Sequence, residues 1–402
     1  MINTKLILVD GLPGSGKSTI AHFLARQMEL NDIKVKWIYE TIDDHPLEYH
    51  VKEFKLETFL DEFESAYPDH LQKFIDQILK DEYTYIIDSS LFKEILGRDI
   101  LLDQNQDRIF SNRMFEKVCS ILKPLNSVYI LLYQNDVEKS IDNICTIRGK
   151  AWGNSYINAY DGSIISKKRN LKGKKALLGI MQEISDLALK LFPEMDIKKL
   201  LIENSKLEWD QYRKQILDFL ELKQVEEKLF DTSFEEYCGE YLGIKIHINN
   251  KRLCIDSFWP NLKLIPVDND VFEFEGFPIK FKFIRDENKI VRSIKIISAY
   301  RYFKDGEEIP KKNCKELNSS ELNMFCGEYQ AVEDKKARKI LLKDSKLVYI
   351  RNGNMDQILK FIDKNTFVCA GTSIRLTFNQ KNKIKSFVLS SGNKKEIAYE
   401  KI

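Results

Sequence analysis

A glycine-rich segment near the start of the chain has the clearest chemical pattern. Residues 11–18 read Gly-Leu-Pro-Gly-Ser-Gly-Lys-Ser, which fits the spacing G-x-x-x-x-G-K-[ST]. Glycines here let backbone N–H groups turn toward phosphate oxygens, while the lysine reaches the β- and γ-phosphates and the serine hydroxyl binds Mg²⁺. The alternative is a turn that fits the pattern by chance. We expect the following residues to bind a nucleoside triphosphate: Gly11, Pro13, Gly14, Ser15, Gly16, Lys17, Ser18 and Thr19.

A carboxylate that helps to hold the metal ion is expected beside this loop. Asp88 ends the apolar run Tyr85-Ile86-Ile87. At the end of a neighbouring strand it would lie next to the loop and hold Mg²⁺ together with Ser18. The alternative is that Asp88 caps the turn that follows the strand. The sequence has no N-K-x-D motif, which would read guanine, so we expect ATP as the nucleotide.

Two further positions could act on the phosphoryl acceptor. Glu40 directly ends the second predicted strand and could accept the proton of an acceptor hydroxyl. Asp43 is the alternative base, and His45 is more typical of a structural loop residue. Arg148 precedes a polar segment and the basic run 167–175, so it could close over the triphosphate and stabilise the developing charge. A solvated basic loop is the other interpretation. The predicted catalytic residues are Lys17, Glu40, Asp88 and Arg148.

Alternating strands and helices must position these residues. Short apolar runs predict strands at 5–10, 34–39, 83–88, 127–132 and 198–202. Helical spacing is present at 71–79, 114–122, 176–191 and 209–222. Strands separated by helices predict a doubly wound parallel α/β sheet, in which ligands bind at the carboxyl ends of the strands. The segments after Asp10, Tyr39, Asp88 and Leu132 should therefore converge.

The second half of the chain changes to period-two alternation, which is typical of an antiparallel sheet. It also repeats itself, since Tyr237-Cys238-Gly239-Glu240-Tyr241 returns as Phe325-Cys326-Gly327-Glu328-Tyr329. We predict an all-β domain of two tandem repeats, built as paired half-barrels or as two small open barrels. The predicted boundaries are a first domain at 1–222, a linker at 223–233, and repeats at 234–318 and 319–402.

Composition limits the classes of protein. The 402 residues are 43% hydrophobic and 31% charged, so the chain is globular. No apolar run approaches the ~20 residues of a membrane span, and a strand directly at the N-terminus leaves no room for a signal peptide. Seven cysteines without a C-x-x-C pair favour reduced thiols in the cytoplasm and argue against a zinc site.

The net charge of +2 conceals an asymmetry between the halves. Residues 235–402 carry 31 Lys and Arg against 23 Asp and Glu, whereas the preceding 234 residues carry 32 against 38. Opposite net charges are compatible with docking of the halves, with an anionic partner, or with unrelated solvated surfaces.

Residues 1–220 resemble the P-loop kinase superfamily, which includes nucleoside monophosphate kinases, polynucleotide kinases and zeta-type toxins. The resemblance is carried by Gly11–Thr19, Asp88, Arg148 in a lid-like position, and Ile202–Ser205, where such kinases pass the adenine. Asp88 is followed by Ser89 rather than by the Asp-Arg of thymidylate kinases, and acceptor-binding arginines of the polynucleotide kinase type are not evident near Glu40. The β repeats faintly resemble lipocalin-like domains appended to bacterial enzymes, which implies no activity.

These observations predict an ATP- and Mg²⁺-dependent kinase that phosphorylates a hydroxyl of a small molecule or of a modified biomolecule. The β repeats would then recognise the acceptor or brace a homodimer. One alternative is a regulatory ATPase whose nucleotide state controls the binding of a partner. Another is a nucleic-acid end-processing kinase, motivated by the basic half, although no dense stripe of basic and aromatic residues supports it. No membrane association is expected.

Overall fold

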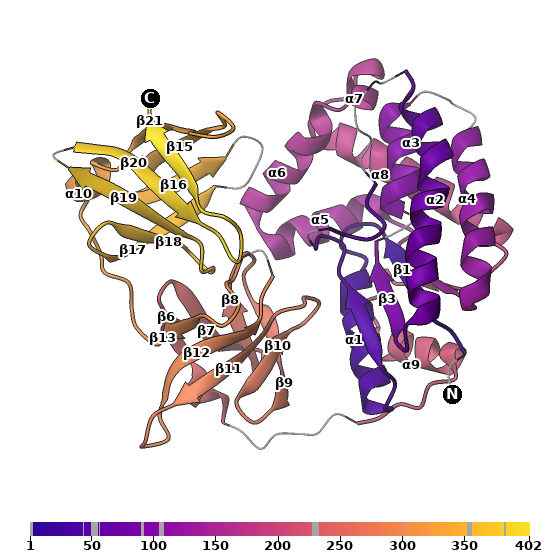
Figure 1. Cartoon of the computed structure of the whole chain (residues 1–402), viewed down its shortest axis with the longest axis horizontal. Helices are drawn as coiled ribbons and strands as arrows, with labels where there is room; N and C mark the ends of the chain where they lie inside the picture. The colour runs from indigo at the N-terminus through magenta and orange to yellow at the C-terminus, as the bar shows by residue number, and fades with distance from the viewer. Residues whose placement is uncertain are drawn as a thin grey trace. The chain divides into compact units, whose positions relative to one another are not determined.

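The computed structural model describes residues 3–42, 44–49, 55, 57–89, 92–103, 108–226, 233–300, 302–351, 356–381 and 383–402. The chain forms two compact units (Figure 1). The first contains Met1–Thr146 and Tyr156–Glu227, and the second contains Ile147–Ser155 and Lys228–Ile402. The domain boundaries predicted at 222, 233 and 318 stay a prediction, and residues 227–232 of the predicted linker lie outside the described residues.

A parallel sheet forms the centre of the first unit, as the sequence predicts. Among its described residues five strands are ordered β2-β3-β1-β4-β5. Their bounds are β1 Leu6–Gly11, β2 Val35–Ile38, β3 Thr84–Asp88, β4 Val128–Tyr133 and β5 Lys198–Glu203. The register pairs Val9 with Asp88 and Gly11 with Leu132. The carboxyl ends of β1, β3 and β4 therefore meet at one edge.

Helices cover both faces of this sheet (Figure 1). Their bounds are α1 Lys17–Leu30, α2 Phe59–Lys80, α3 Gly97–Leu102, α4 Ile109–Leu122, α5 Val137–Arg148, α6 Lys150–Asp161, α7 Ile164–Lys168, α8 Gly173–Leu191 and α9 Trp209–Leu220, with a π-helix at Phe92–Leu96 and 3₁₀ turns at Lys123–Leu125 and Phe192–Glu194. Alternate residues of β1 face opposite sides of the sheet and pack against the two layers of helices. Ile7 and Val9 pack with α1 and α9, whereas Leu6 and Leu8 pack with α2, α4 and α8.

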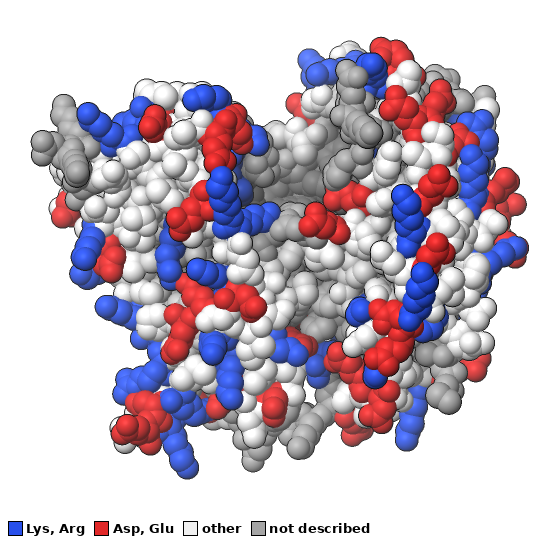
Figure 2. All heavy atoms as spheres, viewed as in Figure 1, with Lys and Arg blue, Asp and Glu red and all other residues white. Residues whose placement is uncertain are grey.

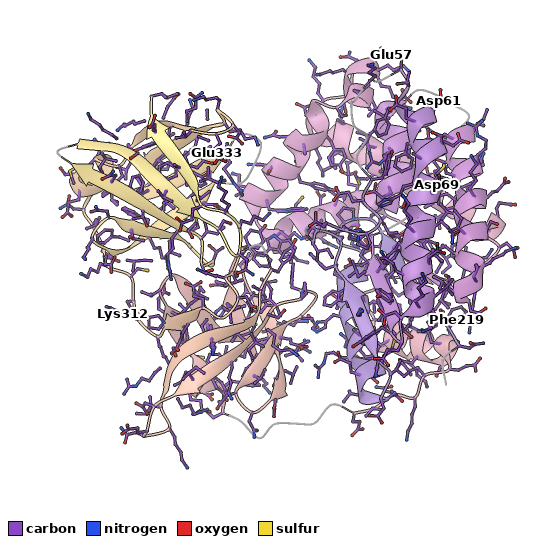
Figure 3. The ribbon with its side chains drawn as sticks, viewed as in Figure 1. Glu57, Asp61, Asp69, Phe219, Lys312 and Glu333 are labelled. Carbon is purple, nitrogen blue, oxygen red and sulfur yellow. The ribbon has the colours of Figure 1, made fainter. Side chains whose placement is uncertain are left out.

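Helix α2 is longer than the predicted segment 71–79, because it continues in the N-terminal direction through Pro68 to Phe59. Proline removes one backbone donor and disfavours a helix interior. Burial of Phe63 and Tyr67 on the same side as Leu71 offsets this cost. The opposite side carries exposed Asp61 and Asp69 (Figure 3).

The second unit contains two antiparallel sheets, and each repeat builds its own. In the described part of the first repeat, eight strands follow chain order from β6 to β13: β6 Gly239–Tyr241, β7 Ile244–Asn249, β8 Arg252–Asp256, β9 Leu262–Asp268, β10 Val271–Phe274, β11 Lys280–Arg285, β12 Val291–Ser298 and β13 Glu308–Pro310, after a 3₁₀ turn at Phe234–Tyr237. Tyr241 forms a parallel bridge with Lys312, and the N–H of Leu242 donates to the carbonyl of Lys312 at 2.9 Å. This sheet therefore curls back toward its first strand.

The second repeat forms a closed barrel: β14 Gly327–Ala331, β15 Ala337–Lys343, β16 Lys346–Arg351, β17 Gln357–Asp363, β18 Thr366–Cys369, β19 Arg375–Lys381, β20 Lys383–Ser390 and β21 Ile397–Lys401, preceded by α10 Ser319–Asn323. Paired half-barrels are therefore wrong, and an open barrel is wrong for this repeat, because Tyr329 pairs with Lys401 and joins β14 to β21. The barrel is compatible with the lipocalin-like resemblance. Buried aromatic residues fill its centre: Phe325, Tyr329, Phe367, Phe378, Phe387 and Tyr399.

The duplication extends to individual hydrogen bonds. The Tyr241 hydroxyl donates to the carbonyl of Tyr237 at 2.8 Å, and the Tyr329 hydroxyl donates to that of Phe325 at the same distance. The four-residue offset is the same in both repeats. The sequence match thus reflects a shared local structure.

Charges on the second unit are mixed. On the face shown in Figure 2, basic and acidic side chains are interspersed over its strands. The Lys339 ammonium lies 2.6 Å from a Glu328 oxygen, and Lys395 lies at the same distance from Glu333 (Figure 3). Part of the positive charge of the second unit is therefore paired with acidic side chains. In the part of the chain that the structure describes, no helix combines the length and apolarity needed to cross a bilayer.

Candidate functional site

The glycine loop, residues 11–19, connects β1 to α1 and has a backbone that only glycine adopts easily. Gly14 and Gly16 have φ values of 89° and 85°, which residues with a side chain rarely adopt. A Cβ at Gly14 would lie 2.8 Å from the Cβ of Ile144, and a Cβ at Gly16 would meet the ring of Trp209. Helix α1 begins at Lys17, so its first N–H groups and the positive end of its dipole face the loop.

Asn204 braces this loop from the end of β5. Its side chain is fully buried, and its Nδ2 donates a hydrogen bond to the carbonyl oxygen of Ser15. Its own backbone N–H donates to the carbonyl of Tyr133 at 2.9 Å. Asn204 thus ties the loop to the ends of β4 and β5. The available signal in the sequence was a lone amide side chain directly after the strand Lys198–Glu203.

Lys17, Ser18, Glu40 and Asp88 come together at the carboxyl edge of the sheet. Lys17 is 7% exposed, and its Nζ lies 3.6 Å from Oε2 of half-buried Glu40. Asp88 is fully buried at the end of β3. Burial raises the pKa of Asp88 most and the charge of Glu40 raises it further, while the Ser18 hydroxyl and the Lys17 ammonium offset part of this rise. The four side chains therefore share one electrostatic environment.

The donor set fits a hard cation. The Ser18 hydroxyl and the backbone of Glu40 both lower the pKa of Asp88, but neither carboxylate oxygen makes a hydrogen bond of ordinary geometry within the described ranges. A buried carboxylate without such partners is costly, and a divalent cation would offset that cost. Mg²⁺ prefers oxygen ligands such as a carboxylate and a serine hydroxyl. Asp88 and Ser18 could hold such an ion together, and their role as metal ligands stays a prediction.

The predicted base candidates differ in what surrounds them. Glu40 lies in the turn after β2, and its charge raises the pKa of Tyr160 on α6, a smaller effect than burial of that phenol. Asp43 lies outside the described residues. His45 is buried, and its Nδ1 accepts a hydrogen bond from the N–H of Leu47 at 3.2 Å. This contact matches the loop role expected of His45.

Arg148 belongs to the second unit, and the residues around Lys17 belong to the first. It ends α5, and its guanidinium carbon lies 3.8 Å from the ring centroid of Trp259 and 4.6 Å from that of Trp152. Both distances are within the range of cation–π interactions. The basic run after it is engaged with acids: Arg169 pairs with Asp103, and Lys174 lies 3.0 Å from a Glu138 oxygen.

Glu94 and Arg98 form a partly buried ion pair that no sequence motif indicated, and both charges act on Tyr67. Arg98 donates to Oε2 of Glu94 at 2.7 Å, and its guanidinium lies over the ring of Phe63. Burial raises the pKa of the Tyr67 phenol, as do Glu94 and Asp10, the residue before the loop. The i,i+4 spacing of Glu94 and Arg98 was the only signal for this pair.

Comparison with known proteins finds partial likeness in structure. No protein-family model matches the chain, and no curated protein matches it. It is similar to the YorR protein of Bacillus subtilis in complex with phosphorylated GDP, at 14% identity and a TM-score of 0.32, over 54% of this chain and 96% of that one.

Two kinases show similar values. Deoxyadenosine kinase from M. mycoides with bound dCTP has 14% identity and a TM-score of 0.31, over 54% of this chain and 98% of that one. Thymidylate kinase from Candida albicans has 14% identity and a TM-score of 0.30, over 55% and 92%. The fold described above rests on strand order and register, independently of these likenesses.

Proposed function

We propose that the chain is a kinase that transfers the γ-phosphoryl group of ATP to a hydroxyl of a small molecule or a modified biomolecule. The observation that carries this proposal is the buried, hydrogen-bond-poor carboxylate of Asp88 beside Lys17 and Ser18, at the mouth of a glycine loop. Catalysis of phosphoryl transfer is mostly positioning and charge stabilisation, which such a cluster provides.

Each residue has one task in this proposal. Loop N–H groups and Lys17 bind the phosphates, while Ser18 and Asp88 hold Mg²⁺, which when bound neutralises charge on the β- and γ-oxygens. Lys17 pairs with Glu40 in the structure. A triphosphate would compete for the same ammonium, and Glu40 would then accept the proton of the acceptor hydroxyl. Arg148 would stabilise charge on the transferred group.

A transfer assay tests the proposal. The full chain is incubated with γ-labelled ATP, Mg²⁺ and a panel of nucleosides, nucleoside monophosphates, sugars and oligonucleotides. We expect label in one class of acceptor, and Lys17→Ala should lower the rate by roughly 10²-fold or more, because it removes charge stabilisation at the phosphates. Failure of wild-type protein to label any acceptor while binding ATP would contradict the kinase.

A regulatory ATPase is the second candidate, because Ile147–Ser155 includes the last two residues of α5 yet belongs to the β unit, whereas the rest of α5 belongs to the first unit. ATP consumption without label transfer would favour this function. The end-processing alternative finds no support in the mixed charges of Figure 2. Oligonucleotide binding with a steep salt dependence would be needed to support an end-processing function.

A further inference from the structure

Two arginines lie opposite each other at one end of the barrel in the second repeat. Arg338 lies near the start of β15, Arg351 ends β16, and the register pairs them directly across the two strands. Residues paired in this way point to the same face of a sheet. That face is the inner one, because Tyr349, two residues before Arg351, belongs to the buried core of the barrel. Both half-buried guanidinium groups therefore belong to the inside of this end.

The contacts of the two arginines agree with this inward direction. The Nε of Arg338 donates to the Tyr349 hydroxyl at 3.2 Å, and its guanidinium carbon lies 5.8 Å from the ring centroid of Tyr399. Both tyrosines are fully buried. Burial raises the pKa of the Cys369 thiol to about 12, and the charge of Arg351 offsets part of this rise. Arg351 is therefore close enough to a fully buried core residue to act on it.

The positive charge of this pair is not balanced by acids in the described part of the chain. The Nε of Arg351 is buried and forms no hydrogen bond there, and neither guanidinium lies within ion-pair distance of a described carboxylate. Asp334 is close enough to Arg338 for its pKa to be lowered, but Lys336 lowers it more and lies 2.7 Å from it. Like charges directly opposite destabilise a sheet, and a partly buried charge without a counter-ion is costly. An anion between the two guanidinium groups would offset both costs.

The first repeat shows that the fold does not require these arginines. The tyrosine of the repeated motif pairs with Ile244 in the first repeat and with Arg338 in the second. The same register, continued by two residues, places Ser257 where the second repeat has Arg351. Ile244 is fully buried. An apolar and a small residue thus suffice at these positions, and the arginine pair belongs to the second repeat alone.

We propose that this end of the barrel binds the carboxylate or phosphate group of a small molecule between Arg338 and Arg351. Each guanidinium presents a planar fork of N–H donors, which matches two oxygens of such a group. Burial raises the pKa of the Tyr349 phenol, an effect that the two arginines only partly offset. The phenol therefore keeps its proton and can donate a further hydrogen bond to the anion. The site lies wholly in the second unit and uses no residue of the glycine loop, so it is independent of the proposed kinase activity.

Matched substitutions in the full chain test the proposal. Arg351→Met removes the charge but keeps a side chain of similar length, and Arg338→Ile introduces the residue type of the first repeat. Lys339→Met is the control, because Lys339 is exposed on the outer face of the same strand and pairs with Glu328. Isothermal titration uses benzoate, phenyl phosphate and the neutral amide benzamide, so that only the head group of the ligand varies.

We expect wild-type protein and Lys339→Met to bind benzoate or phenyl phosphate alike, and benzamide about tenfold or more weakly. Each arginine variant should lose about tenfold or more in affinity for the anion, because charge-assisted hydrogen bonds are lost. Arginine-dependent binding of benzoate alone would identify a carboxylate as the ligand, and of phenyl phosphate alone a phosphate. Phosphate taken up by the glycine loop is common to all variants. Unaltered affinity in both arginine variants, an equal loss in Lys339→Met, or no saturable binding to wild type would overturn the site and leave the kinase proposal untouched.

Discussion

Asp88 is a residue at which the needs of stability and of function conflict. Its side chain is fully buried beside Glu40, and both effects raise its pKa. A carboxyl group whose pKa is higher in the folded than in the unfolded chain stabilises the fold at low pH, and this contribution is lost as pH rises through the folded-state value. Asp88 therefore costs stability at neutral pH, which is typical of residues kept for binding.

Asp88→Asn should remove this loss of stability at neutral pH. Folding raises the pKa of Asp88 from 3.8 to about 7. The free energy of unfolding of the wild type should therefore fall as the pH rises between these values, and this fall should be absent in Asp88→Asn. At pH 8 we expect Asp88→Asn to be more stable than wild type by roughly 1–3 kcal/mol, since one pKa unit corresponds to about 1.4 kcal/mol. Urea unfolding at pH 4 and pH 8 measures the difference. ATP turnover should fall in the same variant, and parallel pH profiles of stability would refute the account.

The loop between β1 and α1 leaves no room for a side chain at Gly14. At Gly14 a side chain meets both an unfavourable φ and the Cβ of Ile144 at 2.8 Å. Gly162 has open space around its Cβ and no positive φ, so it provides a matched control.

Gly14→Ala should therefore lower the free energy of unfolding by about 1–3 kcal/mol, from backbone strain and the clash together. It should also weaken MgATP binding, because the N–H groups lose their orientation. Gly162→Ala should change neither quantity appreciably. Thermal unfolding and isothermal titration with MgATP check both variants, and equal effects at the two positions would show that the loop backbone carries no special constraint.

The elements that the sequence predicted well are those whose signal is local. The bounds of the parallel strands were predicted to within one residue because each strand is a short apolar run, and the glycine loop Gly11–Thr19 follows directly from its residue spacing. Helix α2 was only half predicted because Pro68 interrupts its pattern. Closure of the barrel depends on pairing Tyr329 with Lys401, and the contact of the Arg148 guanidinium with the Trp259 ring joins distant positions. No local pattern encodes either.

At the scale of the whole molecule, the two repeats of the second unit differ in whether their sheet closes into a barrel, but they share one internal tyrosine hydrogen bond. Tyr241 and Tyr329 are both fully buried, and each donates to a carbonyl four residues earlier. Lys311 and Lys401 also take matching places, since each lies against the glycine two residues before the corresponding tyrosine, Gly239 and Gly327. The same tyrosine hydrogen bond is therefore part of both repeats.

Tyr241→Phe and Tyr329→Phe should then behave alike. Each removes one buried hydrogen bond and leaves a carbonyl without that partner, so each should cost about 1 kcal/mol of unfolding free energy, within the range of 0.5–1.5 kcal/mol for such bonds. Because the two tyrosines belong to separate sheets, the double variant should show the sum to within about 0.5 kcal/mol. Denaturant unfolding of the three variants gives these values. A large loss of unfolding free energy in one repeat and none in the other would mean that only one repeat depends on its tyrosine hydrogen bond. The repeats would then share a fold but not the contacts that stabilise it.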